Sequence, residues 1–170
     1  MKKLDVKTIA LNAVIAAVYA ALTIGLAPIS YGQVQMRISE VMIFLAFYNK
    51  KYIPGLVLGC FIANVPSSLG AYDMVFGTFA TLLAVVAMNK VSNRYVGGIL
   101  GGLINGIIVG IELTLAFHTP FLLNAVYVFV GEVVVLEIGA FLFGLLEKNE
   151  PLLKIINCLL YTSDAADDRI

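Results

Sequence analysis

The sequence predicts an all-α integral membrane protein with six transmembrane helices, and two observations support this fold class. Hydrophobic residues make up 61% of the 170 residues, charged residues only 13%, and the mean hydropathy is +0.96. A small soluble domain has a single core, which cannot bury so much apolar surface. Apolar stretches also recur to about position 146, whereas a secretory signal would give one short stretch followed by polar sequence. The chain itself is therefore expected to cross the bilayer repeatedly.

Proline, glycine, asparagine and charged residues divide this apolar sequence into six runs. The runs cover about 8–27, 38–48, 52–65, 74–89, 96–117 and 121–146. A helix needs about 20 apolar residues to cross a hydrocarbon core of about 30 Å, so the second and third runs are short. Short helices of this kind are expected to lie against neighbouring helices or to begin inside a cavity enclosed by protein.

The lysine and arginine residues predict that both termini are cytoplasmic. With the N-terminus inside, the cytoplasmic side receives Lys2, Lys3, Lys7, Lys50, Lys51, Lys90, Arg94, Lys148 and Lys154. The outer side receives only Arg37, if Arg169 in the tail is set aside. Basic residues accumulate on the cytoplasmic side of membrane proteins, so every loop agrees with an N-in, C-in topology.

The chain is expected to contain one domain and a short foreign tail. Residues 1–156 are predicted to form a single six-helix membrane domain. The last segment, "NCLLYTSDAADDRI" at 157–170, abandons the apolar pattern and ends in a cluster of aspartates. We expect it to be a non-native tail or a scar of sequence assembly.

Five carboxylates fall within or at the ends of the predicted spans. They are Glu40, Asp73, Glu112, Glu132 and Glu137. On the predicted topology the first four lie at similar depth in the outer half of the membrane, and Glu137 lies near the midplane. Intramembrane charges are costly and face a bundle interior or a polar cavity. Any one of them could serve structure by pairing with another carboxylate, with Arg37 or with an amide, but four at one depth predict an outward-facing ligand pocket.

The residue types around these carboxylates predict the chemistry of the ligand. Ionised carboxylates only accept hydrogen bonds, asparagine amides both accept and donate, and aromatic rings offer flat apolar faces. The candidate substrate-binding residues are Arg37, Glu40, Asn64, Tyr72, Asp73, Asn105, Glu112 and Glu132, with Tyr31, Phe117 and Tyr127 as further aromatic residues. A planar, cationic ligand rich in N–H donors suits this lining.

Two of these residues have a second interpretation that stays open. Arg37 is three residues before Glu40 and therefore either keeps that carboxylate ionised and oriented or snorkels to the outer interface. Asp73 either lines the pocket or caps the following helix, whose N-terminus favours a carboxylate.

Small residues predict close helix contacts in two places. Ala13, Ala17 and Ala21 recur every four positions in the first run, which suits either a partner helix or another helix of the same chain. In "VGGILGGLINGIIVG", at 96–110, glycines have the same spacing. No strand precedes them and no lysine follows, so tight helix packing explains them better than a phosphate loop does.

The sequence lacks the residues that several functional classes require. The sequence has no P-loop motif, so the chain is not expected to hydrolyse ATP itself. Its single histidine, His118, has no metal-ligand partners, and no nucleophile–base pair stands out. We expect no enzyme activity, no catalytic residue, no metal, no cofactor and no nucleic-acid partner.

The segments "LAPISYGQVQMRISE" and "NVPSSLGAYDMVFGTFATLLA", together with the six short spans and the alanine-striped first helix, resemble the QueT family. Its members are substrate-binding subunits (S components) of energy-coupling factor (ECF) transporters for queuosine precursors. The resemblance covers about positions 7 to 148. It implies an S-component-like bundle in the cytoplasmic membrane of a bacterium.

The resemblance also implies a ligand and partners. The ligand would be a 7-deazaguanine, either 7-aminomethyl-7-deazaguanine or queuine, and Ala13, Ala17 and Ala21 would contact a transmembrane T subunit that works with two cytoplasmic ATPases. Three alternatives remain: an S component for thiamine or riboflavin, a stand-alone secondary transporter for a small organic cation, and a small membrane enzyme or assembly factor.

Overall fold

A computed structural model describes residues 6–31 and 36–148, and this part of the chain is helical throughout, without a β-strand. The predicted all-α class is therefore confirmed. The expected foreign tail at 157–170 lies outside the described residues. The elements are α1 (Val6–Gly25), α2 (Ala27–Ser30), η1 (Ile38–Ile43), α3 (Phe44–Tyr48), η2 (Lys50–Tyr52), α4 (Ile53–Asn64), η3 (Asp73–Gly77), α5 (Thr78–Met88), α6 (Arg94–Phe117) and α7 (Phe121–Glu147).

Each of the six apolar runs forms a helical segment, but the segments differ in length. Three helices, α1, α6 and α7, are long and apolar enough to cross a membrane. The stretch 38–48 combines a 3-10 turn with α3, the stretch 73–88 combines a π-helical turn with α5, and α4 has 12 residues. The fourth run, expected at about 74–89, is helical over 73–88, and the prediction of six membrane spans stays a prediction.

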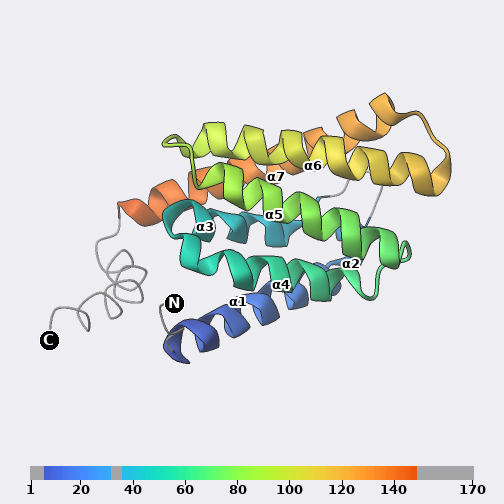
Figure 1. The fold of residues 1–170 in the computed structure, drawn as a ribbon. Helices are drawn as coiled ribbons and strands as arrows, with labels where there is room; N and C mark the ends of the chain where they lie inside the picture. Colours follow the sequence, from blue (N-terminus) through green and yellow to red (C-terminus); the bar gives the residue numbers. More distant parts are fainter. Residues whose placement is uncertain (1–5, 32–35, 149–170) are drawn as a thin grey trace, which may run out of the picture.

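The segments run alternately up and down the long axis of the bundle (Figure 1). The start of α1 and the end of α7 lie at the same end, together with the α3–α4 and α5–α6 connections. We call this the lysine end, because Lys7, Lys50, Lys51, Lys90 and Lys148 belong to these segments. The connections α4–α5 and α6–α7 lie at the opposite end, which we call the α6–α7 end.

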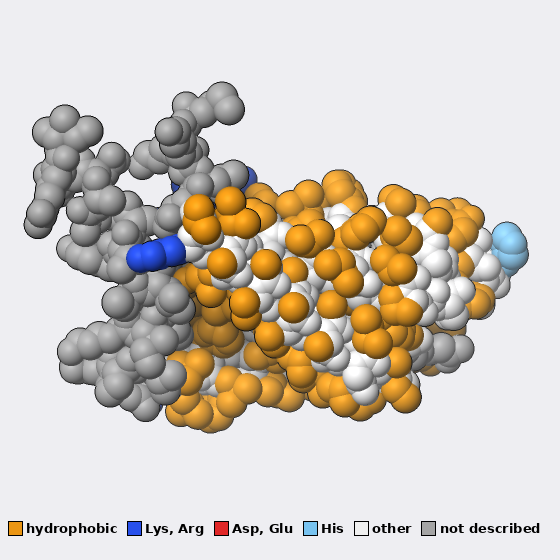
Figure 2. All heavy atoms as spheres, turned by 90° about the horizontal axis from the view of Figure 1, so that it is seen from below, with side chains coloured by type: hydrophobic (Ala, Val, Ile, Leu, Met, Phe, Trp, Pro, Cys, Tyr) orange, Lys and Arg blue, Asp and Glu red, His pale blue; other side chains and the backbone are white. Residues whose placement is uncertain are grey.

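The surface between the two ends is apolar. Figure 2 shows one side of the molecule covered by hydrophobic side chains, with cationic groups at one end and a histidine at the other. Exposed large residues such as Leu122, Val75 and Ile138 have 72%, 64% and 52% of their surface accessible. Exposing such a surface to water would be unfavourable, whereas contact with lipid chains would not be. The fold is therefore that of a membrane protein.

Glycine lets α6 and α7 pack with their backbones in near contact, as the spacing predicts. A Cβ atom added at Gly106 would lie 3.0 Å from the carbonyl oxygen of Ala125, and one at Gly110 would lie 2.9 Å from the Cα of Ala125. A similar contact joins α1 to α4, where a Cβ at Gly59 would lie 3.0 Å from Ala16 Cα. In lipid, close approach of this kind gains van der Waals contact that larger side chains would prevent.

The buried side chains form one main core beneath these contacts. Tyr19, Phe44, Leu56, Met88 and Leu136 are fully buried and belong to the same cluster. They come from α1, α3, α4, α5 and α7, so the short helices are held between the long ones. This arrangement fits the expectation that short helices lie against neighbours.

Candidate functional site

A pocket of about 430 Å³ opens at the α6–α7 end of the bundle. This volume lies within the range of about 300–1,000 Å³ that is usual for small-molecule sites. Its lining residues are Tyr31, Ser67, Ser68, Leu69, Asp73, Leu113, Phe117, Thr119, Leu123, Asn124 and Tyr127. The lining thus combines aromatic faces with hydroxyl, amide and carboxylate groups.

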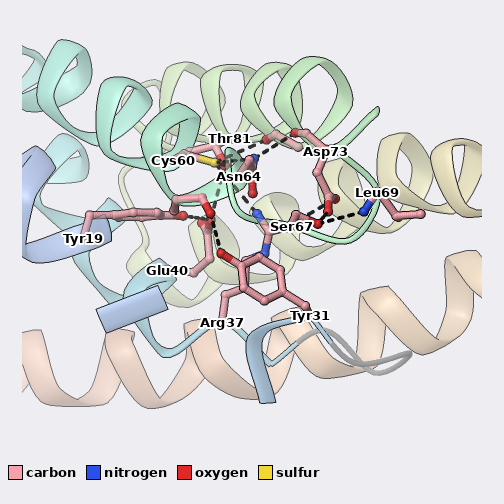
Figure 3. Close-up of polar contacts among 12 residues, drawn as sticks. Tyr19, Tyr31, Arg37, Glu40, Cys60, Asn64, Ser67, Leu69, Asp73 and Thr81 are labelled. Atoms are coloured by element: carbon pink, nitrogen blue, oxygen red, sulfur yellow. Dashed lines mark hydrogen bonds and ion pairs between the residues drawn. The ribbon is translucent and has the colours of Figure 1, made fainter. Parts of the chain in front are cut away.

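Asp73 is the charged residue of the lining, and its carboxylate is held from two sides. Ser67 donates a hydrogen bond to Oδ2, and Arg37 Nη2 lies 3.6 Å from Oδ1 (Figure 3). Its side chain is only 2% exposed, and among the described residues Oδ1 has no hydrogen-bond donor. The carboxylate is therefore fixed in place with one acceptor oxygen still available.

The backbone at Asp73 explains this placement. The π-helical turn Asp73–Gly77 lacks regular α-helical hydrogen bonding, and the amide of Asn64 donates to the carbonyl of Asp73 at 2.8 Å. Single π-turns inside helices are rare and often occur at functional sites. No side-chain capping bond occurs at the start of this turn, and the Asp73 carboxylate contacts Ser67 and Arg37 instead.

Arg37 lies at the centre of the polar groups and is 3% exposed. Its guanidinium lies 5.9 Å from the ring centroid of Tyr31, and Nη1 lies 3.9 Å from the sulfur of Cys60. The side chain is therefore inside the bundle and does not snorkel to an interface. Tyr31 is fixed in turn, because its hydroxyl donates to the carbonyl of Ala63.

Glu40 lies deeper and is oriented by hydroxyl groups rather than by Arg37. Tyr19 and Thr81 both donate to Glu40 Oε1, the latter at 3.2 Å (Figure 3). Arg37 acts on this carboxylate only through charge. Arg37 forms its ion pair with Asp73, and hydroxyl groups orient Glu40 in place of Arg37, which the sequence suggested for that role.

Glu112 and Glu132 complete the cluster. They are 0% and 2% exposed, and within the described part of the chain no donor lies within hydrogen-bond distance of either Glu112 oxygen. Charge interactions connect Glu112 with Asp73 and Arg37, and Glu132 with Glu40 and Arg37. Four buried carboxyl groups thus lie near one guanidinium, although only Asp73 lines the pocket, and this surplus of acidic over basic groups would favour a cationic ligand.

The two candidate amides have structural partners. Asn64 is fully buried and donates to Asp73, whereas Asn105 is 4% exposed and donates to the carbonyl of Gly101 at 3.2 Å. Neither lines the pocket. Tyr72 lies outside it as well, because its side chain is 45% exposed and stacks on Phe76 with 6.3 Å between ring centroids.

Several lining residues were not among the candidates named from the sequence. Ser67, Ser68 and Leu69 come from the α4–α5 connection, Thr119 comes from the α6–α7 connection, and Asn124 comes from the first turn of α7. Asn124 donates to Thr119 at 2.8 Å and to Thr114 at 3.1 Å, so it fixes this wall of the pocket. The only signal was the polar character of "PSS" and "HTP" next to apolar runs.

The alanine stripe of α1 faces outward. Ala13, Ala17 and Ala21 are exposed, whereas Ala16 and Ala20 are buried against the rest of the bundle. The sequence left open whether the alanines of α1 contact a partner helix or another helix of the same chain. The second interpretation applies to Ala16 and Ala20. The face formed by Ala13, Ala17 and Ala21 is open to lipid or to a partner.

An apolar helical bundle with a buried, polar pocket at one end defines the class of multi-pass membrane proteins that handle a small molecule. Comparison with known proteins gives the family: the chain belongs to the QueT transporter family, whose model matches residues 9–148. It is 36% identical over 165 residues to "Queuosine precursor transporter QueT" of Lactococcus lactis subsp. cremoris (strain MG1363), covering 88% of this chain and 97% of that protein. No solved structure is significantly similar. The chain is therefore a transport protein and not an enzyme.

Proposed function

We propose that the chain is the substrate-binding subunit of an ECF-type importer and captures a 7-deazaguanine precursor of queuosine from outside a bacterial cell. The observation that carries the proposal is the pocket with Asp73 in its lining and the Arg37-centred carboxylates behind it, in a chain of the QueT transporter family. 7-Aminomethyl-7-deazaguanine and queuine are planar, carry several N–H donors and have a protonated amine. These features match aromatic faces, hydrogen-bond acceptors and excess negative charge.

The contacts suggest a role for each carboxylate. Asp73 meets the ammonium group, because it reaches the pocket and keeps Oδ1 available as an acceptor. Glu112 and Glu132 are buried behind the lining; Glu112, with no donor to either oxygen among the described residues, would accept from the guanine-like edge of a ligand that reaches past the lining. Glu40 is assigned to positioning, since its Oε1 already accepts from Tyr19 and Thr81. Charge-assisted hydrogen bonds of this kind are roughly twice as strong as neutral ones.

The proposed topology has six membrane segments with both termini in the cytoplasm. The lysine end would then lie inside, as the distribution of basic residues favours, and the pocket at the α6–α7 end would open outward. This orientation suits capture from outside the cell.

The proposed partners are a transmembrane T subunit and two ATPases. The chain has no P-loop motif of its own, so import driven by ATP would need separate ATPases. The exposed face of Ala13, Ala17 and Ala21 would allow a partner helix to approach the α1 backbone closely.

Calorimetric titration of the purified protein tests the ligand. We expect tight binding of 7-aminomethyl-7-deazaguanine or queuine, with guanine far weaker and with no binding of thiamine or riboflavin. Binding of thiamine or riboflavin in place of a deazaguanine would move the chain to another vitamin class.

Reconstituted vesicles test the transport mechanism. We expect uptake of the ligand only when the T subunit, the ATPases and ATP are present. Uptake by this chain alone would identify a stand-alone secondary transporter for a small organic cation and would overturn the ECF proposal.

A further inference from the structure

Helix α1 has two faces in different environments. Ala13, Ala17 and Ala21 are exposed, whereas Tyr19 and Thr23 are fully buried on the opposite side. The exposed face is the proposed docking surface, and the buried face carries two hydroxyl groups into the bundle. A single rigid helix thus connects the docking surface with the interior.

Both hydroxyl groups contact η1. Tyr19 donates to Glu40 Oε1, and Thr23 Oγ1 lies 2.6 Å from Ser39 Oγ (Figure 3 shows the first contact). The two partners are consecutive residues, so α1 fixes both the position and the rotation of this turn. Thr23 also donates to the carbonyl of Tyr19 at 2.9 Å, which joins the two contacts.

One 3-10 turn separates these contacts from the pocket. The backbone N–H of Glu40 donates to the carbonyl of Arg37 at 2.9 Å. Arg37 in turn lies 3.6 Å from Asp73 and 5.9 Å from the ring centroid of Tyr31, and both of these line the pocket. A rotation of η1 would therefore move the guanidinium relative to two groups of the ligand site.

Packing alone does not require such polar contacts. Apolar residues at the positions of Tyr19 and Glu40 would join α1 to the bundle without the cost of a buried carboxylate. The carboxylate instead accepts two hydroxyl bonds at Oε1, which restrict η1 to one register. Buried polar groups often specify register in this way.

We infer that Tyr19 and Thr23 are positioning residues of the ligand site: through Glu40 and Ser39 they hold the segment that carries Arg37, so that pocket occupancy and the exposed face of α1 depend on each other. The inference rests on the proposed function. Coupling between two sites is reciprocal, so ligand binding must change the environment of the α1 face if docking is to change ligand affinity.

A fluorescent label on the exposed face tests this connection. Ala17→Cys, in a Cys158→Ser background, receives an environment-sensitive fluorophore, while Cys60 is buried and stays unlabelled. The probe is 7-aminomethyl-7-deazaguanine, and calorimetry on the same samples measures binding separately. We expect the ligand to change the emission of the Ala17 label, and a label at the exposed Ile111 on α6 to remain unchanged.

Variants without the Tyr19 or Thr23 hydroxyl group test whether these groups connect the ligand site with the exposed face of α1. Tyr19→Phe and Thr23→Val, made separately so that either can replace the other if one fails to fold, are expected to bind ligand more weakly and, at saturating ligand, to lose the emission change. Tyr52→Phe is the matched control, because its ring is also buried while no hydrogen bond of its hydroxyl to η1 occurs in the described residues. It is expected to keep the emission change.

The outcomes separate the two proposals. Ligand binding with a silent Ala17 label, or with an unchanged response in both hydroxyl variants, overturns the inference and leaves the proposed function intact. Absence of any deazaguanine binding to the folded wild-type chain overturns the proposed function, and the inference falls with it.

Discussion

Arg37 Nη2 lies 3.6 Å from Asp73 Oδ1, beyond hydrogen-bond distance, although both side chains are almost completely buried. The two groups therefore attract each other by charge without using the acceptor capacity of Oδ1. In the proposed function a ligand donates to this oxygen while the attraction of the guanidinium holds the carboxylate in place.

Removing a carboxylate of the site should weaken ligand binding. Asp73→Asn and Glu112→Gln keep the shape of the side chain but remove its charge. Hydrogen bonds to charged groups contribute about 1.5–3 kcal/mol, so we expect the Kd for 7-aminomethyl-7-deazaguanine to rise by about 10- to 150-fold in each variant. Calorimetry measures the change. Glu137→Gln, outside the cluster, is the control, and an unchanged Kd in Glu112→Gln would remove this residue from the site.

Removing Arg37 should destabilise the protein more than removing any other single cation. Arg37→Met leaves buried carboxylates without their counter-charge, which costs about 3–5 kcal/mol in comparable buried pairs. We expect a large drop in the thermal unfolding temperature in detergent, partly restored in Arg37→Met/Asp73→Asn. Arg94→Met tests whether the effect is specific to the buried cation. A double variant no more stable than Arg37→Met would mean that Asp73 is not its main partner.

A methyl group between α6 and α7 should disturb their packing. Gly106→Ala would bring a Cβ to 2.9 Å from Phe129 Cβ and 3.0 Å from the Ala125 carbonyl, so backbone must shift. Overpacking of this kind costs about 1–3 kcal/mol. Gly25→Ala is the matched control, because nothing lies within 4 Å of the added atom. Thermal unfolding of both variants gives the comparison, and equal stability would contradict the close contact.

The ion pair at the lysine end should contribute only modestly to the stability of the fold. Arg94 pairs with Glu147, which also accepts from Tyr48 at 2.6 Å, but the two charged side chains are 26% and 36% exposed. Exposed pairs of this kind contribute about 0–1 kcal/mol, so Glu147→Gln should lower the unfolding temperature slightly. Ligand affinity should not change, because the pocket lies at the other end of the bundle. A loss of affinity would show that the two ends are coupled.

A bulky residue on the exposed face of α1 should separate binding from transport. Ala17→Trp changes no residue of the pocket, so we expect unchanged calorimetric binding. A tryptophan would keep a partner helix from approaching α1, so ATP-dependent uptake with the T subunit and ATPases should be lost. Ile111→Trp on α6 is the control for a bulky residue elsewhere on the apolar surface. Normal uptake with Ala17→Trp would exclude this face as the docking surface.

Periodic features of the sequence predicted much of the fold. Apolar runs gave the six helical segments, and glycine spacing gave the tight α6–α7 contact. The special turns could not be found in this way, because they depend on tertiary hydrogen bonds such as those from Asn64 to Asp73 and from Tyr19 to Glu40. The local sequence does not show which distant residues will become such partners.

The site was predictable in composition but not in detail. Intramembrane position was enough to single out Glu40, Asp73, Glu112 and Glu132, because charge in an apolar run is unusual. The direction of Tyr72 was not predictable, because neighbouring residues of a helix point about 100° apart and the sequence does not show that Asp73, and not Tyr72, is the one that faces inward. The particular lining residues of the α4–α5 connection could not be named in advance, because loops have no periodicity to read.

The glycine contacts between α6 and α7 have a consequence for how a molecule reaches the pocket. Where two backbones already touch, as at Gly106 and Ala125, the helices cannot slide or part without losing contact along their length. We expect the wall of the pocket that they form to be rigid. The rest of the lining includes Tyr31, after the one-turn helix α2, and Ser67–Leu69, in the α4–α5 connection. Entry and exit of a molecule would then depend on movement of these segments rather than on separation of α6 from α7.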